Sequence, residues 1–195
     1  MNTAEIKSAI EKAIPGVALK PVRDSLLIEN PADLPKVAKF LKESESFRLD
    51  YLCSVTGTDY LQFLESVYHL YSMEKKTGPV VLRVRAKKEN PKIPSLVSIY
   101  RGAEFQEREA YDMYGIVYEG HPDLRRIFMW EGFEGFPMRK DYQQEDSETL
   151  EAEDVEWLKE HGIPVPEEMV KRAEELKKQG KRALAEKPGQ SQPSD

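Results

Sequence analysis

Hydrophobic periodicity alternates between that of a helix and that of a strand along residues 1–90, and this order constrains the fold more than any other feature. It predicts a helix over 3–14, strands over 17–22 and 26–29, a second helix beginning between 30 and 35, and strands over 49–55, 61–71 and 80–87. The last three strands follow one another through short connections, which favours antiparallel pairing. We therefore predict an α+β fold: a small mixed, mostly antiparallel sheet with helices on one face.

The ends of these elements follow from capping and turn residues. Thr3 is the predicted cap of the first helix. The second helix begins either near Asn30 or, with Asp33 as its cap, two or three residues later, and Pro35 in the first turn favours the later start. The sequence Thr77-Gly78-Pro79 predicts a turn between the second and third of the last three strands.

After this domain the organisation of the chain changes. A helix is predicted from Ser95 to Tyr114, weakened at Gly102 and ended by Gly115. Glycine and proline then make residues 115–142 an extended, irregular segment. We therefore divide the chain into an α+β domain (1–90), a helix with an extended contact segment (91–142), an acidic helical arm (143–186) and a disordered tail (187–195). The arm is expected to contain helices over 147–161 and 166–186.

Charge and cysteine content exclude several classes of function. The net charge of −6 lies entirely after residue 142, where 14 acids face 8 bases, so the footprint of a nucleic-acid binder is missing. The single cysteine, Cys53, excludes an internal disulfide and any self-contained iron–sulfur or cysteine-type zinc site. We expect Cys53 to be a buried small apolar residue. The first residues show no apolar signal core and no apolar run reaches about 20 residues, so we expect no export, and membrane contact only through partners.

The segment 104–142, here called the strap, has the most unusual composition. It holds nine of the 18 aromatic residues of the chain, together with nine acids and five bases. A surface loop would be more uniformly polar, and a core segment would lack the charges. Aromatic residues and arginines beside carboxylates are typical of protein–protein contact surfaces. The composition therefore predicts that the strap contacts other protein chains.

Familiar catalytic motifs are missing, and the histidines offer only a weak alternative. His121, with Glu119 and Asp123 nearby, could serve as a general base or a metal ligand. The favoured interpretation is a turn residue whose ring bonds a carboxylate or a carbonyl, because no second ligand is spaced to join it. His69 and His161 are expected to be structural.

The charged residues of the strap also allow two interpretations. The basic pairs Arg125-Arg126 and Arg139-Lys140 could bind nucleic acid, but forked pairing with carboxylates explains both signs of charge together. Glu107, Glu109 and Asp112 could form an acid/base site. On a helix beside Arg108 they are more simply its partners, with Glu104–Arg108 and Arg108–Asp112 as i,i+4 pairs.

The same residues resemble a known family. Three blocks carry the resemblance: Glu107-Arg108-Glu109-x-x-Asp112-x-x-Gly115-Ile116, then Gly120-His121-Pro122-Asp123-Leu124-Arg125-Arg126-Ile127, then Pro137-x-Arg139-Lys140-Asp141. They resemble the signature of the thirty-kilodalton subunit of proton-translocating NADH–quinone oxidoreductase, respiratory complex I. Phe136 stands where this family often has histidine, and Gln143 where it usually has proline.

The resemblance implies a scaffold without a catalytic, cofactor or metal site of its own. It implies a peripheral place on the cytoplasmic face of the cell membrane, between the quinone-site subunit and cluster-bearing subunits. FMN and the iron–sulfur clusters would lie in those partners, and NADH oxidation, quinone reduction and proton translocation would belong to the complex. Two alternatives stay open: the equivalent subunit of a membrane-bound hydrogenase or deazaflavin-dependent dehydrogenase complex, and, more distantly, a stand-alone acid/base enzyme using His121.

The interface or signature residues expected from these arguments are Glu107, Arg108, Glu109, Asp112, Gly115, His121, Pro122, Asp123, Arg125, Arg126, Pro137, Arg139, Lys140 and Asp141. Arg125, Arg126, Arg139 and Asp141 are expected to form forked pairs with groups on a partner or on this chain, and Glu107, Arg108 and Asp112 to fix the helix that begins the strap.

Overall fold

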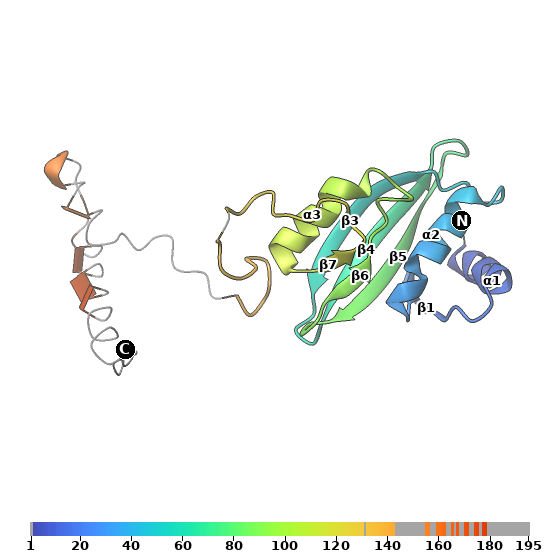
Figure 1. The fold of residues 1–195 in the computed structure, drawn as a ribbon, viewed down its shortest axis with the longest axis horizontal. Coiled ribbons are helices and arrows are strands. Elements are labelled where there is room, and N and C mark those ends of the chain that lie inside the picture. The colour runs from blue at the N-terminus through green and yellow to red at the C-terminus, as the bar shows by residue number, and fades with distance from the viewer. Residues whose placement is uncertain are drawn as a thin grey trace, which may run out of the picture. The chain divides into compact units, whose positions relative to one another are not determined.

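The computed structural model describes residues 2–130 and 132–142 and, beyond these, separate residues between 155 and 178. Residues 1–143 form one compact unit and residues 144–195 a second one. The helices and strands labelled in Figure 1 all belong to the first unit. The segment after residue 90 packs within the same unit as the sheet. The predicted domain boundary at residue 90 stays a prediction.

A five-stranded sheet forms the centre of this unit. Its strands are β1 (Leu19–Val22), β2 (Ser25–Ile28), β3 (Tyr51–Asp59), β4 (Phe63–Ser72) and β5 (Thr77–Lys87). They lie in the order β1-β2-β5-β4-β3, and only β2 and β5 run parallel. The mostly antiparallel sheet is therefore confirmed, with β3 and β1 at its two edges.

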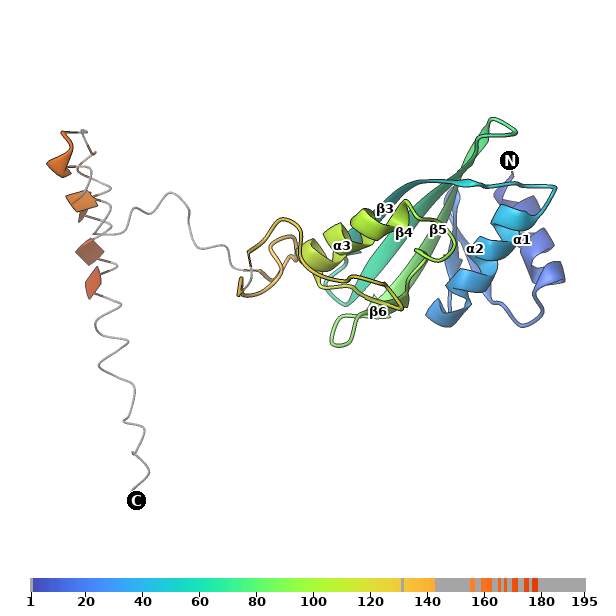
Figure 2. The same ribbon diagram turned by 45° about the horizontal axis from the view of Figure 1, so that its top comes forward.

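The helices cover one face of the sheet, as predicted (Figure 2). They are α1 (Thr3–Ala13), α2 (Leu34–Glu43), preceded by a 3₁₀ turn at Pro31–Asp33, and α3 (Ala103–Tyr114). Ile28, Val84, Ser66 and Gly57 are paired across the sheet and so point to the same face. The Tyr114 ring lies where a Cβ on Gly57 would stand, which places α3 on the face that also holds the core under α1 and α2.

The alternating residues of β5 confirm the strongest strand prediction. Val80, Leu82, Val84 and Ala86 are all buried in the core. The predicted turn at Thr77-Gly78-Pro79 is wrong, because Thr77 already begins β5 and the turn lies over 73–76. The Ser72 hydroxyl accepts from the Lys75 N–H at 3.1 Å and closes that turn.

Of the two predicted helix starts, only the first differs from its prediction. Asn2, rather than Thr3, caps α1, because its side-chain oxygen accepts from the Ala4 N–H at 3.0 Å. For the second helix both proposed starts occur in succession. Asn30 caps the 3₁₀ turn by accepting from the Ala32 N–H, and α2 then begins at Leu34 with Pro35 in its first turn.

The predicted helix from Ser95 is wrong over its first eight residues. The chain first forms a small parallel sheet of β6 (Lys92–Pro94) and β7 (Val117–Glu119), and the Ser95 N–H extends it by donating to the Glu119 carbonyl at 2.8 Å. The helix α3 begins only at Ala103, after Gly102. Gly115, at φ 73°, ends it in the left-handed conformation, as predicted.

Cys53 is exposed, so the prediction that it is buried is wrong. The pairing of β3 with β4 shifts between Leu52 and Ser54, which leaves Cys53 as the extra residue of a β-bulge. The bulge changes the phase of the alternation, so Leu52 and Val55 are buried and Cys53 faces solvent.

The helical arm (143–186) and the tail (187–195) lie mostly outside the described residues. Within the two predicted helices, the residues that are described between 155 and 160 and between 167 and 178 are helical. The prediction of a disordered tail lies wholly outside the described part.

Candidate functional site

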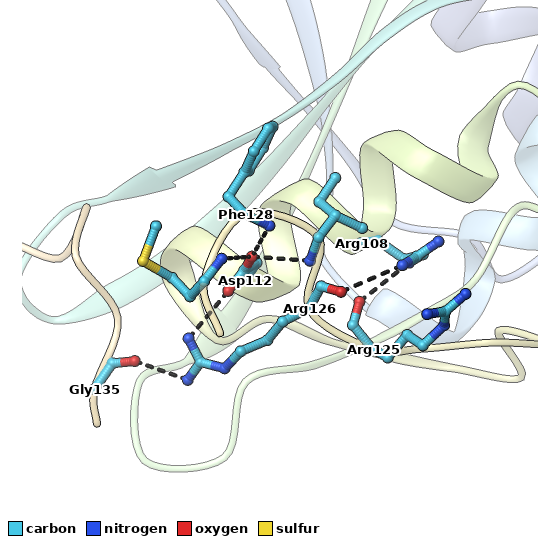
Figure 3. A network of polar contacts seen from close by, with 8 residues as sticks. Arg108, Asp112, Arg125, Arg126, Phe128 and Gly135 are labelled. Carbon is cyan, nitrogen blue, oxygen red and sulfur yellow. Dashed lines mark hydrogen bonds and ion pairs between the residues drawn. The ribbon is translucent and has the colours of Figure 1, made fainter. Parts of the chain in front are cut away.

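Asp112 of α3 organises the strap (Figure 3). Its carboxylate is fully buried and accepts from Ile127 N–H (3.0 Å), Phe128 N–H (2.7 Å), Met129 N–H (3.0 Å) and Arg126 Nη1 (3.0 Å). Burial by itself would raise the pKa of Asp112. The three backbone N–H groups and the guanidinium outweigh it and lower the pKa. One side chain therefore fixes a whole turn of the extended segment to the helix.

Arg126 joins this carboxylate to the next turn of the strap. Its Nη1 donates to Asp112, and its Nη2 donates to the Gly135 carbonyl at 2.9 Å. The guanidinium also lies over the rings of Phe133 and Phe136, with its carbon 5.5 and 5.2 Å from their centroids. The predicted forked pair with a carboxylate is therefore replaced by one bond to a carboxylate and one to a carbonyl.

Arg108 is buried one turn before Asp112 but binds backbone rather than carboxylates. Its Nε donates to the Arg125 carbonyl at 3.1 Å and its Nη2 to the Arg126 carbonyl at 3.3 Å (Figure 3). The predicted i,i+4 pairs with Glu104 and Asp112 are wrong, because Arg108 and Asp112 both bond the backbone of residues 125–129 instead. Together they hold consecutive peptide groups from opposite sides.

Glu107 is fully buried and faces the other way. Its carboxylate accepts from the Ser95 hydroxyl at 2.6 Å and from the Leu96 N–H at 2.7 Å, so it ties α3 to the segment that follows β6. Burial raises the pKa of Glu107 to about 7, and the two hydrogen bonds lower it only in part. None of the described residues forms an ion pair with it.

Glycine is required at residue 115, where the extended part of the strap follows the C-terminus of α3. A Cβ on Gly115 would lie 2.5 Å from the Phe136 ring and 2.7 Å from Arg139 Nη2. Arg139 Nε donates to the Tyr114 carbonyl at 2.6 Å, and its guanidinium carbon lies 4.5 Å from the centroid of the Phe136 ring. The returning end of the strap therefore packs on the helix C-terminus, which only glycine leaves open.

Asp59, at the end of β3, anchors the last part of the strap and was not predicted. Its buried carboxylate accepts from the Lys140 N–H (2.8 Å), the Leu61 N–H (2.7 Å) and Lys88 Nζ (2.9 Å). Burial opposes ionisation, but these donors lower the pKa of Asp59. Asp141 accepts from the same Lys88 Nζ at 3.1 Å. Asp59 and Lys140 lie 81 residues apart in the sequence, so no local pattern around Asp59 indicates this contact.

His121 lies in a turn with both ring nitrogens bonded to backbone. Nδ1 accepts from the Asp123 N–H at 3.0 Å, which places the ring proton on Nε2, and Nε2 donates to the Glu104 carbonyl at 2.9 Å. The ring thus pins the turn at Pro122 to the start of α3. This geometry matches a turn residue bonded to a carbonyl, with neither nitrogen available as a base.

The outer surface of the strap is apolar and aromatic. Four of its large side chains are more than half exposed: Phe105, Phe128, Trp130 and Met138. The Arg125 side chain is 70% exposed, and among the described residues it bonds only Asp123, whose two oxygens lie 3.1 and 2.9 Å from its Nε. The Arg125 guanidinium lowers the pKa of the Asp123 carboxyl. Glu109 and Lys140 are also exposed, so the charged residues of the strap divide into buried anchors and outward groups.

Nothing in the described region is arranged to bind a metal, since no group of three His, Cys, Asp or Glu side chains comes together there.

Of the predicted residues, Glu107, Arg108, Asp112, Arg126 and Arg139 fix the strap internally. Pro137 is half-buried in the returning turn, where the next residue, Met138, donates its N–H to the Met113 carbonyl at 3.1 Å. The arrangement is that of a loop held by internal hydrogen bonds that exposes aromatic side chains.

Comparison with known proteins gives consistent matches. The model of a family described as the 30 kDa subunit of respiratory-chain NADH dehydrogenase matches residues 27–148. An NADH-quinone oxidoreductase subunit of Rhizobium meliloti (strain 1021) is 48% identical over 118 residues, which are 57% of this chain and 62% of that protein. An NADH-quinone oxidoreductase subunit of Roseiflexus sp. (strain RS-1) is 35% identical over 147 residues, 72% of this chain and 84% of that protein. The chain thus spans less than two thirds of the length of the Rhizobium relative.

Among solved structures, a chain of the membrane-bound sulfane sulfur reductase, an archaeal respiratory membrane complex, superposes with a TM-score of 0.60. The match covers 85% of this chain and 94% of that chain at 21% sequence identity, which shows a shared fold.

Proposed function

Because the chain belongs to the family of the 30 kDa subunit of respiratory-chain NADH dehydrogenase, which confirms the resemblance noted in its motifs, we propose that it is a non-catalytic structural subunit of an NADH–quinone oxidoreductase. It holds neighbouring subunits of the peripheral arm together through the strap. NADH oxidation through FMN and iron–sulfur clusters, quinone reduction and the coupled proton translocation are activities of the assembled complex.

One observation carries this proposal: the strap is held by internal hydrogen bonds on its inner side and exposes aromatic side chains on its outer side. Asp112, Arg126 and Arg108 hold the extended backbone in place from within the chain. Trp130 and Phe128 are nevertheless 68% and 60% exposed. A chain folding alone gains little from fixing a loop that displays such side chains, whereas a preformed aromatic surface lowers the cost of ordering on association.

The partners follow from the same surface and from the family. We propose that the strap contacts the quinone-site subunit and the cluster-bearing subunits. Those partners would also supply the flavin, the clusters and the attachment to the cytoplasmic face of the membrane. In the described part of the chain, no helix is both long and apolar enough to cross a membrane.

Purification of the tagged chain from detergent-solubilised membranes tests the proposal. We expect the chain to elute with flavin- and cluster-containing subunits and with NADH–quinone reductase activity. Trp130→Ala should lower the amount of co-eluting subunits at least fivefold. Met73→Ala, a matched change at a residue that is 58% exposed in the β4–β5 turn, should not. Elution of the chain alone, or with a complex that oxidises hydrogen or a reduced deazaflavin instead of NADH, contradicts the proposal.

A further inference from the structure

The outer edge of β3 is open at one short window. Gln106 of α3 closes the edge at Val55, whose N–H donates to the Gln106 side-chain oxygen. Two residues beyond Gly57 the strap lies beside the strand, because the Asp59 side-chain carboxylate accepts from the Lys140 N–H at 2.8 Å. Gly57 lies between these two contacts, on the edge strand of the sheet.

The backbone of Gly57 faces out of this window. In a strand, the N–H and C=O groups of residues two apart point the same way, and the Val55 N–H already points outward to Gln106. Pairing with β4 continues without a shift from Val55 to Gly57, so the alternation holds. Within the described residues, Gly57 has no partner on that side. The window can therefore accept a hydrogen-bonded rung from an added extended segment.

Beside the window lies a cleft of about 400 Å³ between β3 and α3. Its apolar walls include Met113 of α3 and two side chains of the strap, Phe128 and Met138. Phe128 and Met138 are 60% and 55% exposed, so two large apolar groups border a hollow rather than filling it. Such a space fits one long side chain inserted beside an added strand.

The negative charge of Glu109 in the cleft indicates which kind of side chain would bind there. Glu109 lines the cleft, is exposed, and forms no ion pair with any residue between 2 and 130 or 132 and 142. A lone carboxylate beside an aromatic ring and two thioethers matches arginine. Its planar guanidinium stacks on rings and pairs with carboxylates, and its aliphatic stem lies along apolar surface.

We propose that an extended segment of a neighbouring subunit adds to β3 at Gly57 and inserts an arginine into this cleft, where it pairs with Glu109 and lies against Phe128. This inference rests on the proposed function, because it requires the chain to be part of a complex. It assigns a contact on the sheet edge that shares Phe128 and Met138 with the outer surface of the strap but does not include Trp130.

Cysteine protection in the purified complex tests the inference. In a Cys53→Ser background, Met138→Cys reports on the cleft, and Met73→Cys, of similar exposure, serves as the reference. In the isolated full chain both cysteines should react with a polar maleimide at similar rates. In the complex we expect Met138→Cys to react at least tenfold more slowly than Met73→Cys.

Charge reversal then tests the arginine. Glu109→Lys should either restore fast labelling of Met138→Cys in the complex or lower the amount of assembled chain. Glu5→Lys makes the same charge change at an exposed residue of α1 and should do neither. Equal labelling of the two cysteines in an intact complex overturns the inference and leaves the proposed function standing. Protection that Glu109→Lys does not change, with normal assembly, also overturns it. A chain that purifies without partners contradicts the proposed function itself.

Discussion

The body (residues 1–90) and the strap (104–142) are stabilised by different interactions. The body encloses an apolar core that runs from α1 across the sheet. In the described part of the strap, only Ala110, Ile116 and Tyr118 are buried apolar side chains, whereas Glu107, Arg108 and Asp112 are buried charged ones. Apolar burial is spread over many contacts. The strap instead depends on a few charged groups that each bond several backbone groups, so single substitutions should release it.

Asp112→Ala gives the largest expected effect. It removes the acceptor of three backbone N–H groups and leaves the Arg126 guanidinium without its carboxylate. Loss of one partner of a buried charged pair costs about 3–5 kcal/mol. We expect the strap to detach before the body unfolds. Trypsin cleavage after Arg125 and Arg126 should then run well ahead of urea-induced loss of the sheet signal in circular dichroism.

The matched control for Asp112→Ala lies in the body. Leu82→Ala empties a fully buried core position and should cost about 2–5 kcal/mol. In that variant, trypsin cleavage of the strap should follow global unfolding. If cleavage and unfolding coincided in Asp112→Ala as well, the body and the strap would be one cooperative unit, and the contrast drawn above would be wrong.

A pH titration separates the two buried acids of α3. The pKa of Glu107 is raised from 4.5 to about 7, so between these values the folded chain keeps a proton that the unfolded chain releases. This contribution to stability is complete below pH 4.5 and is lost as the pH rises through 7. At roughly 1.4 kcal/mol per pKa unit, the loss is on the order of 3 kcal/mol. The pKa of Asp112 is lowered, so its contribution is lost only at acid pH.

Glu107→Gln is the test of that assignment. The amide keeps the shape and an acceptor oxygen for the Ser95 hydroxyl and the Leu96 N–H, but it does not titrate. The free energy of unfolding, measured by urea titration at several pH values, should fall between pH 4.5 and 7.5 in the unaltered chain. In the variant this fall should be smaller by about 3 kcal/mol. Parallel curves for the two proteins would show that another group causes the pH dependence.

Gly115→Ala probes the junction between helix and strap. The left-handed conformation by itself costs a non-glycine residue about 1–2 kcal/mol, and the added Cβ would meet the Phe136 ring at 2.5 Å. Gly120→Ala is the matched control, because Gly120 has φ 85° but nothing within 4 Å of the Cβ position. Thermal unfolding should show a larger loss at Gly115. Equal losses would mean that backbone strain alone, and not packing of the strap, makes glycine necessary there.

The sequence predicted the body better than the strap for a physical reason. Alternation in β5 and the stripe of α2 report on burial against a flat sheet, which repeats along the chain and needs no knowledge of distant residues. Cys53 was misplaced because a bulge adds one residue to β3, and the sequence of a single strand carries no mark of its partner's register.

In the strap, the residues that matter were recognisable but their partners were not. Arg108 and Asp112 stand one turn apart on a helix, where an ion pair between them is the local expectation. Each instead bonds backbone groups 15 or more residues away. The Asp59 carboxylate accepts a hydrogen bond from the Lys140 N–H, which lies 81 residues away in the sequence. A hydrogen bond from a side chain to a distant peptide group can form with almost any residue type at that position. Such bonds therefore leave no recognisable pattern in the sequence.

Arg125→Ala should have the smallest effect on folding and the clearest effect on assembly. The Arg125 side chain is 70% exposed, and its one partner within the described part of the chain, Asp123, is also exposed, so its loss should leave the urea midpoint of the chain unchanged. In the complex this arginine would be covered, and truncation at an interface lowers affinity. We expect at least a tenfold lower fraction of assembled chain after detergent purification. Arg126→Ala is the contrasting variant, because it removes an internal anchor and should lower the urea midpoint as well. If Arg125→Ala assembled normally and supported quinone reduction at the normal rate, Arg125 would have no place in the interface.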